Sequence, residues 1–171
     1  MRASLTALPT FRKDGSITAV VEVPRGSGIK FRYDPEADIF EYGRTLPLGI
    51  TYPYCFGFIP GTRAEDGDPL DVLVLTEAPT FPGVVIPVRL IGVVELSQKD
   101  EGGERVRNDR LIAVPWEETR THEDLTDRQR QEIERFFLNS VFFTPKHAKV
   151  RGWKGPAAAG KLIRQARKRA A

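Results

Sequence analysis

The sequence predicts an α+β fold, in which a curled antiparallel sheet comes first and helices follow. Short segments rich in β-branched and aromatic residues, separated by Gly and Pro, occupy the chain before residue 115, whereas helical patterns begin near residue 126. Runs of strands followed by helices are typical of an α+β domain. With 171 residues and 40% hydrophobic content, the chain can bury one core, so we expect a single domain over residues 1–171.

Six segments have the composition of strands. Each is enriched in residues that favour extended backbone and is bounded by residues that favour turns. The segments are residues 17–23, 29–33, 39–42, 71–76, 84–96 and 105–114. Their order along the chain predicts a sheet whose strands all precede the helices.

The first helix is predicted over residues 126–140. Thr126 and Gln129 have the spacing of a capping box, in which two side chains satisfy free backbone N–H groups at the start of a helix. A stripe of apolar residues at helical spacing follows, and we expect it in the core. The stripe consists of Ile133, Phe136 and Phe137.

Basic residues gather at the end of the chain. From residue 146 onward there are nine Lys or Arg and no Asp or Glu, which leaves 17 basic against 23 acidic residues in the preceding part. Such a tail can contact nucleic acid or an anionic membrane. However, Pro156 opens a helical pattern over residues 156–169, in which Leu162, Ile163 and Ala166 form an apolar stripe. We therefore expect a docked amphipathic helix with solvated cations, and neither a membrane nor a nucleic acid as partner.

Cysteine use and hydropathy favour a cytoplasmic protein. The sequence has no run of 18 apolar residues and no signal-peptide pattern. Its single cysteine, Cys55, excludes an internal disulfide and fits a reducing compartment. Cys55 lies between aromatic residues, so we interpret it as a core residue and not as a nucleophile. His122 and His147 are isolated, and no Cys/His spacing predicts a metal site.

Three carboxylates stand close together just before a strand. Asp66, Asp68 and Asp71 occupy positions i, i+2 and i+5, with Gly67 and Pro69 between them. Gly and Pro favour a tight turn that would aim the carboxylates in one direction. Carboxylates this close repel one another, and a divalent cation that prefers oxygen ligands neutralises them well. A solvated acidic turn is the alternative that spacing alone leaves open.

The chain resembles the family I soluble inorganic pyrophosphatases, whose signature is Asp-x-Asp-Pro-x-Asp followed by an apolar strand. Further blocks follow the family's order and approximate spacing between residues 19 and 153. They are Glu22 in Val21-Glu22-Val23-Pro24, Lys30, Arg44, Tyr52-Pro53, Phe81-Pro82-Gly83, Ile91-Gly92-Val93-Val94 and Ile112-Ala113-Val114-Pro115. The resemblance implies a five-stranded OB-like β-barrel with flanking helices, Mg²⁺-dependent hydrolysis of pyrophosphate or a related phosphoanhydride, and a homo-oligomer such as a hexamer. Mn²⁺ is an alternative metal.

The resemblance also implies roles for individual residues. Metal ligation falls to Asp66, Asp71 and Asn108, and phosphate binding falls to Lys30, Arg44 and Arg110. Asp68 would accept a proton from the attacking water or orient it. Glu22 would hold the surrounding groups in order.

Several positions depart from the family pattern. The chain has Arg32, Gln98 and Asn108 where the family has carboxylates. It also lacks a tyrosine at Phe56 and the Tyr-Lys pair at Ser140-Val141. The three replaced carboxylates remove three negative charges and add one positive charge, so we expect fewer metals and slow or altered turnover.

Two classes of function remain open. The first is a divergent pyrophosphatase, and the second is a catalytically impaired relative that binds a phosphate ligand or acts as a scaffold. Acids in the long hairpin, Asp100, Glu101, Glu104 or Asp109, could replace the missing ligands. Asp109 is expected to point away from Asn108 and Arg110, because alternate residues of a strand face opposite sides. Nucleic-acid binding by a barrel is disfavoured, because the aromatic residues are better explained as core or site wall.

Overall fold

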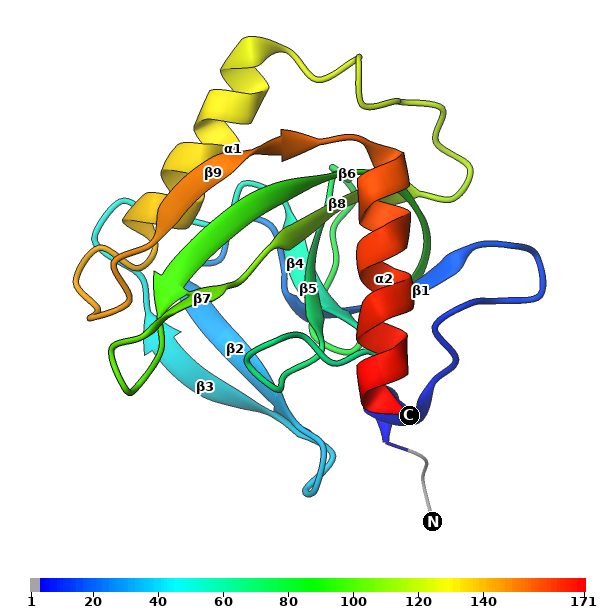
Figure 1. The fold of residues 1–171 in the computed structure, drawn as a ribbon, viewed down its shortest axis with the longest axis horizontal. Coiled ribbons are helices and arrows are strands. Elements are labelled where there is room, and N and C mark those ends of the chain that lie inside the picture. Colours follow the sequence, from blue (N-terminus) through cyan, green and yellow to red (C-terminus); the bar gives the residue numbers. More distant parts are fainter. Residues whose placement is uncertain (1–3) are drawn as a thin grey trace.

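The structure, a computed structural model, describes residues 4–171 and is built on a curled seven-stranded sheet with two helices outside it (Figure 1). The strands of this sheet are β1 (Ile17–Val23), β4 (Cys55–Ile59), β5 (Leu70–Val74), β6 (Val85–Lys99), β7 (Arg105–Arg107), β8 (Arg110–Pro115) and β9 (Lys149–Lys154). A separate hairpin consists of β2 (Ile29–Asp34) and β3 (Ile39–Thr45). The helices are α1 (Asp127–Asn139), α2 (Pro156–Ala170) and a short 3₁₀ turn, η1 (Leu5–Ala7). The predicted α+β class is confirmed.

Strand pairing explains the curl of the sheet. The order is β1-β4-β5-β8-β6-β7, and β1 pairs with β6 as well as with β4. Strand β9 pairs with the other part of β6, so this long strand contacts four partners. One pair, β5 with β8, is parallel, which corrects the expectation of a wholly antiparallel sheet. Strand β8 lies between β5 and β6 and is antiparallel to β6, so β5 and β8 share one direction and β6 has the opposite one.

The six predicted segments all contain strands, with the largest differences in the long hairpin. Strands β4 and β9 were not predicted, and β9 lies between α1 and α2, which corrects the expectation that all strands precede the helices. The segment predicted over residues 105–114 divides into β7 and β8, with a break at residues 108 and 109. Strand β6 also extends beyond the predicted segment, to Lys99. Before the break, β7 pairs with the C-terminal end of β6, and after the break, β8 pairs with the preceding part of β6. The break also sets the direction of the side chains that follow.

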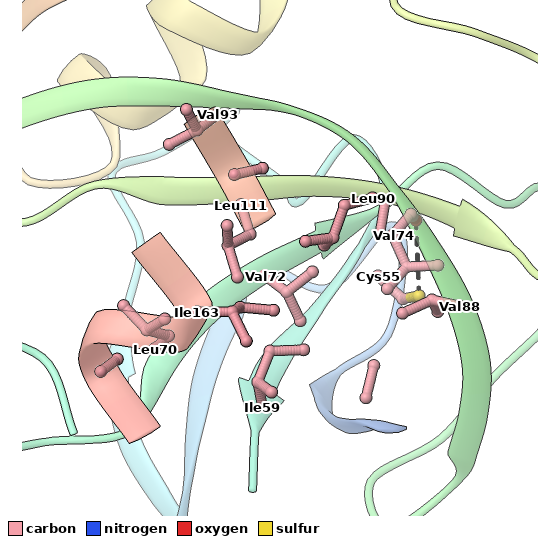
Figure 2. Packing of buried hydrophobic residues seen from close by; sticks show 14 of the residues in the cluster. Cys55, Ile59, Leu70, Val72, Val74, Val88, Leu90, Val93, Leu111 and Ile163 are labelled. Carbon is pink, nitrogen blue, oxygen red and sulfur yellow. Dashed lines mark hydrogen bonds between the residues drawn. The ribbon is translucent and has the colours of Figure 1, made fainter. Parts of the chain in front are cut away.

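Helix α2 covers one apolar cluster of the sheet (Figures 1 and 2). Ala159, Ile163 and Ala166 are buried, whereas Leu162 is only partly buried, so the predicted stripe is displaced slightly around the helix. Ile163 packs with core residues of β5, including Leu70 and Val72. Removal of this apolar surface from water holds the helix on the sheet.

Helix α1 covers a second apolar cluster. The predicted capping box is present, since the Thr126 side chain accepts from the Gln129 N–H and the Gln129 side chain accepts from the Thr126 N–H. Ile133, Phe136 and Phe137 are buried, as predicted. The two clusters place a helix on each side of the strands, which leaves strand ends and loops to form the site.

The single cysteine lies in the core. Cys55 is fully buried, its thiol donates to the Val74 carbonyl oxygen at 3.6 Å, and burial raises the pKa of the thiol to about 11. A thiol that stays protonated is a poor nucleophile, which agrees with its interpretation as a core residue. Over residues 4–171, no helix combines the length and the apolar character needed to cross a membrane.

The packing of α2 gives a stability prediction. Ile163→Ala should lower the free energy of unfolding by about 2–5 kcal/mol, because it removes a fully buried side chain and leaves a cavity. Leu162→Ala, on the same helix but only partly buried, is the matched control and should cost clearly less. Urea denaturation of both variants measures the difference. Equal losses would contradict the described orientation of α2.

Candidate active site

Four cations gather around one small cavity between the β2–β3 hairpin, β8 and the end of α1. They are Lys30, Arg44, Arg110 and Lys146, and the wall between them includes Phe56, Gln98, Ser140 and Val141. Cations that are partly withdrawn from water repel one another more strongly than they would in solvent. A cluster of this kind is typical of a site for a polyvalent anion.

Lys30 and Arg44 face each other across the β2–β3 hairpin. The two residues are register partners, and a bulge follows directly after Lys30. Gly43 permits the bend, because a Cβ at this position would lie 2.7 Å from the Lys30 carbonyl oxygen. Like charges placed opposite each other destabilise a strand pair. Bulges often re-aim side chains at functional sites, so this arrangement favours a ligand role over a structural one.

The C-terminal end of α1 holds Arg44 in place. Its guanidinium donates to the Ser140 carbonyl oxygen at 2.6 Å. Ser140 is the C-cap of α1, so this carbonyl carries partial negative charge from the helix dipole. The hydrogen bond leaves the other N–H groups of Arg44 to serve the cavity.

Arg110 joins the cation cluster to the acidic turn. Its guanidinium forms an ion pair with Asp71 at 2.5 Å, hydrogen-bonds the side-chain oxygen of Asn108, and lies 5.8 Å from the centre of the Phe56 ring. Arg110 and Asp71 are mostly buried, with side-chain exposures of 12% and 25%. Asn108, Asp71 and Arg110 are therefore brought together as predicted, although Arg110 is the common partner.

The acidic turn is anchored by the backbone that precedes it. Thr62 donates to the Ile59 carbonyl oxygen and accepts from the Leu70 N–H, which joins the two ends of the loop. Asp66 accepts from the Asp68 N–H at 3.1 Å, and Gly67 has a φ of +92°, a conformation that favours glycine. The sequence pattern correctly predicted this turn.

The turn does not bring its three carboxylates together. Asp66 and Asp68 are exposed, only Asp71 is partly buried, and in residues 4–171 no group of three His, Cys, Asp or Glu side chains is close enough to hold a metal ion. The expected convergence of the three aspartates opposite Lys30 and Arg44 is thus not seen. Mutual repulsion explains the spread, and Arg110 already neutralises Asp71.

The surroundings of Asp66 also affect its proton binding. Partial withdrawal of the carboxyl from water, opposed in part by the Asp68 N–H, raises the pKa of Asp66 above its usual value, and the charges of Asp71 and Asp68 add to this increase. The carboxylate oxygens of the acidic turn are hard ligands, and among them Asp71 is paired with a cation, Arg110. Their chemistry therefore fits a divalent cation such as Mg²⁺.

Glu22 lies behind the acidic turn, on β1. It is half-buried and accepts from the Tyr33 N–H at 2.9 Å. Burial raises the pKa of Glu22 to about 7, with smaller contributions from Asp71 and Asp68, while the Tyr33 N–H and Lys30 oppose the rise. Glu22 therefore links the β2 strand that carries Lys30 to the acidic side of the site.

The long hairpin places its polar residues on two opposite sides. Gln98 lines the cavity, and Asn108 contacts Arg110. Asp109 instead accepts from the Leu96 N–H at 3.1 Å and forms an ion pair with Arg107 at 2.5 Å. The two side chains have different partners, as predicted, although residues 108 and 109 lie in the break between β7 and β8 and not within a strand. Asp109 is therefore bound to Leu96 and Arg107, and not to Arg110.

Two of the departures from the family pattern lie at different depths. Arg32 is exposed and forms a surface pair with Glu41 on the neighbouring strand, outside the cavity. Phe56 is buried and provides the ring below Arg110. Only the second position therefore shapes the cavity wall.

Lys146 was not singled out from the sequence. The sequence groups it with the basic residues of the C-terminal tail, for which solvent exposure is expected, yet it lines the cavity. Its position depends on the bond from the Lys99 N–H to the Lys146 carbonyl oxygen, at 2.6 Å, which ties the loop after α1 to the end of β6. No local pattern indicates such a long-range contact.

Comparison with known proteins identifies the family. The pattern that defines the inorganic pyrophosphatase family matches residues 19–171. The chain belongs to this family. It is 40% identical to the inorganic pyrophosphatase of Sulfolobus acidocaldarius over 161 residues, which cover 90% of each chain. It is also 41% identical to the inorganic pyrophosphatase of Geobacillus stearothermophilus over 152 residues, 86% of this chain and 89% of the relative.

Solved structures of the same family share the fold. The crystal structure of inorganic pyrophosphatase from Thermus thermophilus superimposes with a TM-score of 0.87 at 38% identity and covers 98% of this chain and 99% of that one. The similarity thus includes the hairpin, the acidic turn and both helices. It confirms the resemblance that the sequence motifs indicated.

The raised pKa of Glu22 predicts how one substitution responds to pH. The folded protein holds this proton more tightly than the unfolded chain, so the associated stability is lost as pH rises from about 4.5 to about 7. Glu22→Gln removes the loss and should gain about 2 kcal/mol in the free energy of unfolding at pH 8 relative to its effect at pH 5. Urea denaturation in the presence of a chelator measures both values.

The matched control for this prediction is Glu36→Gln, a change of an exposed glutamate outside the site. It should leave the pH dependence of the free energy of unfolding unchanged. A Glu22→Gln effect of the same size at both pH values would contradict the prediction.

Proposed function

We propose that this protein hydrolyses pyrophosphate to two phosphates with the help of divalent cations. The observation that carries the proposal is the cavity lined by Lys30, Arg44 and Arg110, which the ion pair between Arg110 and Asp71 connects to the acidic turn. A small cavity with excess positive charge suits a compact polyanion. The names of the relatives at about 40% identity give the same substrate and support the assignment.

The cations bind the substrate and stabilise the leaving phosphate. Lys30 and Arg44 approach from the β2–β3 hairpin, and Arg110 approaches from β8. Hydrolysis of a phosphoanhydride needs positioning and charge neutralisation more than covalent chemistry, and these three side chains provide both. Asp68, an exposed residue of the acidic turn, accepts the proton of the attacking water or orients that water.

Asp66, Asp71 and the side-chain oxygen of Asn108 would hold the metal, which we propose is Mg²⁺, with Mn²⁺ as an alternative. When bound, such an ion neutralises phosphate oxygens and lowers the pKa of a coordinated water. Glu22 keeps the surroundings of the site in order by accepting a hydrogen bond from the backbone of β2, the strand that carries Lys30. Because Gln98 and Asn108 contribute no charge, we propose that the protein holds fewer ions than a relative with carboxylates there and turns over more slowly.

A catalytically impaired binding protein is the less favoured function. Gln98, Asn108, Ser140 and Val141 would support it, since they weaken metal binding and substrate contacts relative to the family pattern. However, the acidic turn keeps all three aspartates, and similarity to named pyrophosphatases extends over 90% of the chain. These two features favour an enzyme.

We also propose that residues 1–171 form a single domain that assembles into a homo-oligomer, with a hexamer as the specific expectation. Large apolar side chains at the surface support assembly, because subunit interfaces cover such groups. Leu48, Phe142 and Phe143 are 104%, 70% and 82% exposed. Light scattering that gives a monomer would contradict this proposal.

The activity itself is tested by phosphate release. The protein with Mg²⁺ should release two phosphates for each pyrophosphate, and Asp68→Asn should lower kcat by about a hundredfold or more, as expected for loss of a general base. Glu123→Gln, a change of an exposed glutamate outside the cavity, is the control and should keep full activity. Absence of Mg²⁺-dependent phosphate release from the unchanged protein would contradict the proposal and favour the binding function.

The two amides predict the strength of metal binding. Asn108→Asp should increase Mg²⁺ affinity about tenfold, because it adds a carboxylate next to the Arg110–Asp71 pair. Gln98→Asp should have a smaller effect, since Gln98 lines the cavity on the side of the cations. Isothermal titration calorimetry measures both. If Asn108→Asp has no effect while Asp109→Asn abolishes binding, Asp109 is the true ligand.

A further inference from the structure

Lys146 differs from the other basic residues of the C-terminal region by its surroundings. Lys149, Arg151 and Lys154 on β9 are exposed, whereas Lys146 is half-buried and lines the cavity that holds Lys30, Arg44 and Arg110. Its backbone is fixed on both sides, by the Lys99 N–H and by the Thr144 hydroxyl. The position of Lys146 is therefore a property of the fold.

No acid compensates Lys146. Within residues 4–171 no carboxylate lies at ion-pairing distance from its ammonium group, and Asp71 is paired with Arg110. Burial and the charges of Lys30, Arg110 and Arg44 lower the pKa of Lys146 to about 8, and Asp71 opposes them weakly. A lysine that is withdrawn from water among three other cations is destabilising unless an anion occupies the cavity.

We propose that Lys146 is a further substrate-binding residue, which contacts a phosphate oxygen of pyrophosphate from the loop that follows α1. The inference rests on the proposed function and adds a specific contact to it. Lys146 lines the cavity from the loop between α1 and β9, whereas Lys30 and Arg44 line it from the hairpin, so the substrate would be held between β2–β3, β8 and this loop. Val141 lines the same cavity and contributes no charge, which leaves Lys146 as the cation of this segment.

The first test measures substrate affinity with the charge removed. Lys146→Met keeps the aliphatic stem, and it should lower kcat/KM for pyrophosphate by about tenfold or more, mainly through KM, as expected for the loss of one charge-assisted contact. Lys149→Met, on exposed β9, is the matched control and should leave kcat/KM unchanged. Thermal unfolding of both variants checks that the fold is intact.

A binding measurement separates this proposal from the proposed function. Calorimetry with imidodiphosphate, a pyrophosphate analogue that resists hydrolysis, should show the same loss of affinity in Lys146→Met, whether or not the protein turns over pyrophosphate. Unchanged affinity in a folded Lys146→Met protein would overturn the role of Lys146. Absence of turnover with normal binding of the analogue would overturn only the proposed function.

A pH profile tests whether the ammonium charge is responsible. Lys146 is fully charged below about pH 7 and loses its proton as pH rises through about 8. The facing charged groups are Lys30 on β2, Arg44 on β3, Arg110 on β8 and Asp71 on β5. The arginine of Lys146→Arg stays charged throughout this pH range. The ratio of its kcat/KM to that of the unchanged protein should therefore increase about tenfold between pH 7 and pH 9.

Comparison of the two proteins at each pH cancels the ionisation of the substrate and of other groups. A constant ratio from pH 7 to pH 9 would overturn the role of the ammonium charge.

Transfer of the charge to a neighbouring position is a further check. Val141→Lys in the Lys146→Met background should recover part of the lost affinity for imidodiphosphate, because residue 141 lines the same cavity.

Discussion

The ion pair between Arg110 and Asp71 is the interaction on which the site depends. It connects the last residue of the acidic turn to the strand that enters the core next to it, and both residues belong to the parallel pair of strands β5 and β8. Since the pair is mostly buried, loss of either partner would leave an uncompensated charge. The cations of the cavity and the carboxylates of the turn are therefore balanced against each other in the absence of ligands, and a substrate or metal has to compete with this pair.

That balance explains the arrangement of the remaining groups. Lys30 and Arg44 oppose each other, and the carboxyl terminus of α1 offsets part of the charge of Arg44. On the acidic side, withdrawal from water raises the pKa of Glu22 and of Asp66, and the neighbouring acids add to this increase. The site is thus prepared for ligands of both signs, which agrees with a reaction that needs a polyanion and a divalent cation together.

Much of the fold could be predicted from sequence, because the elements are defined by local chemistry. The capping box of Thr126 and Gln129 predicted the start of α1. The different partners of Asn108 and Asp109 were also expected, although the two residues lie in a break between strands and not within one. The resemblance supplied the candidate site residues. Lys146 escaped prediction because a contact between residues 99 and 146 places it in the cavity. The separation of the three aspartates was not predicted either, since it depends on the ion pair that Arg110 forms with Asp71.

The double pairing of β1 has a consequence for how the chain folds. Its first residues pair with β6, where Ile17 lies opposite Val88, and its later residues pair with β4, where Val20 lies opposite Phe58. Both contacts join segments that are far apart in sequence, so the chain has to lose much of its conformational freedom before either gives stability. Sheets dominated by such contacts fold in about milliseconds to seconds, well above the microseconds of simple helical bundles. During that interval the apolar residues of β1, which are buried on both faces in the folded protein, stay open to association with other chains.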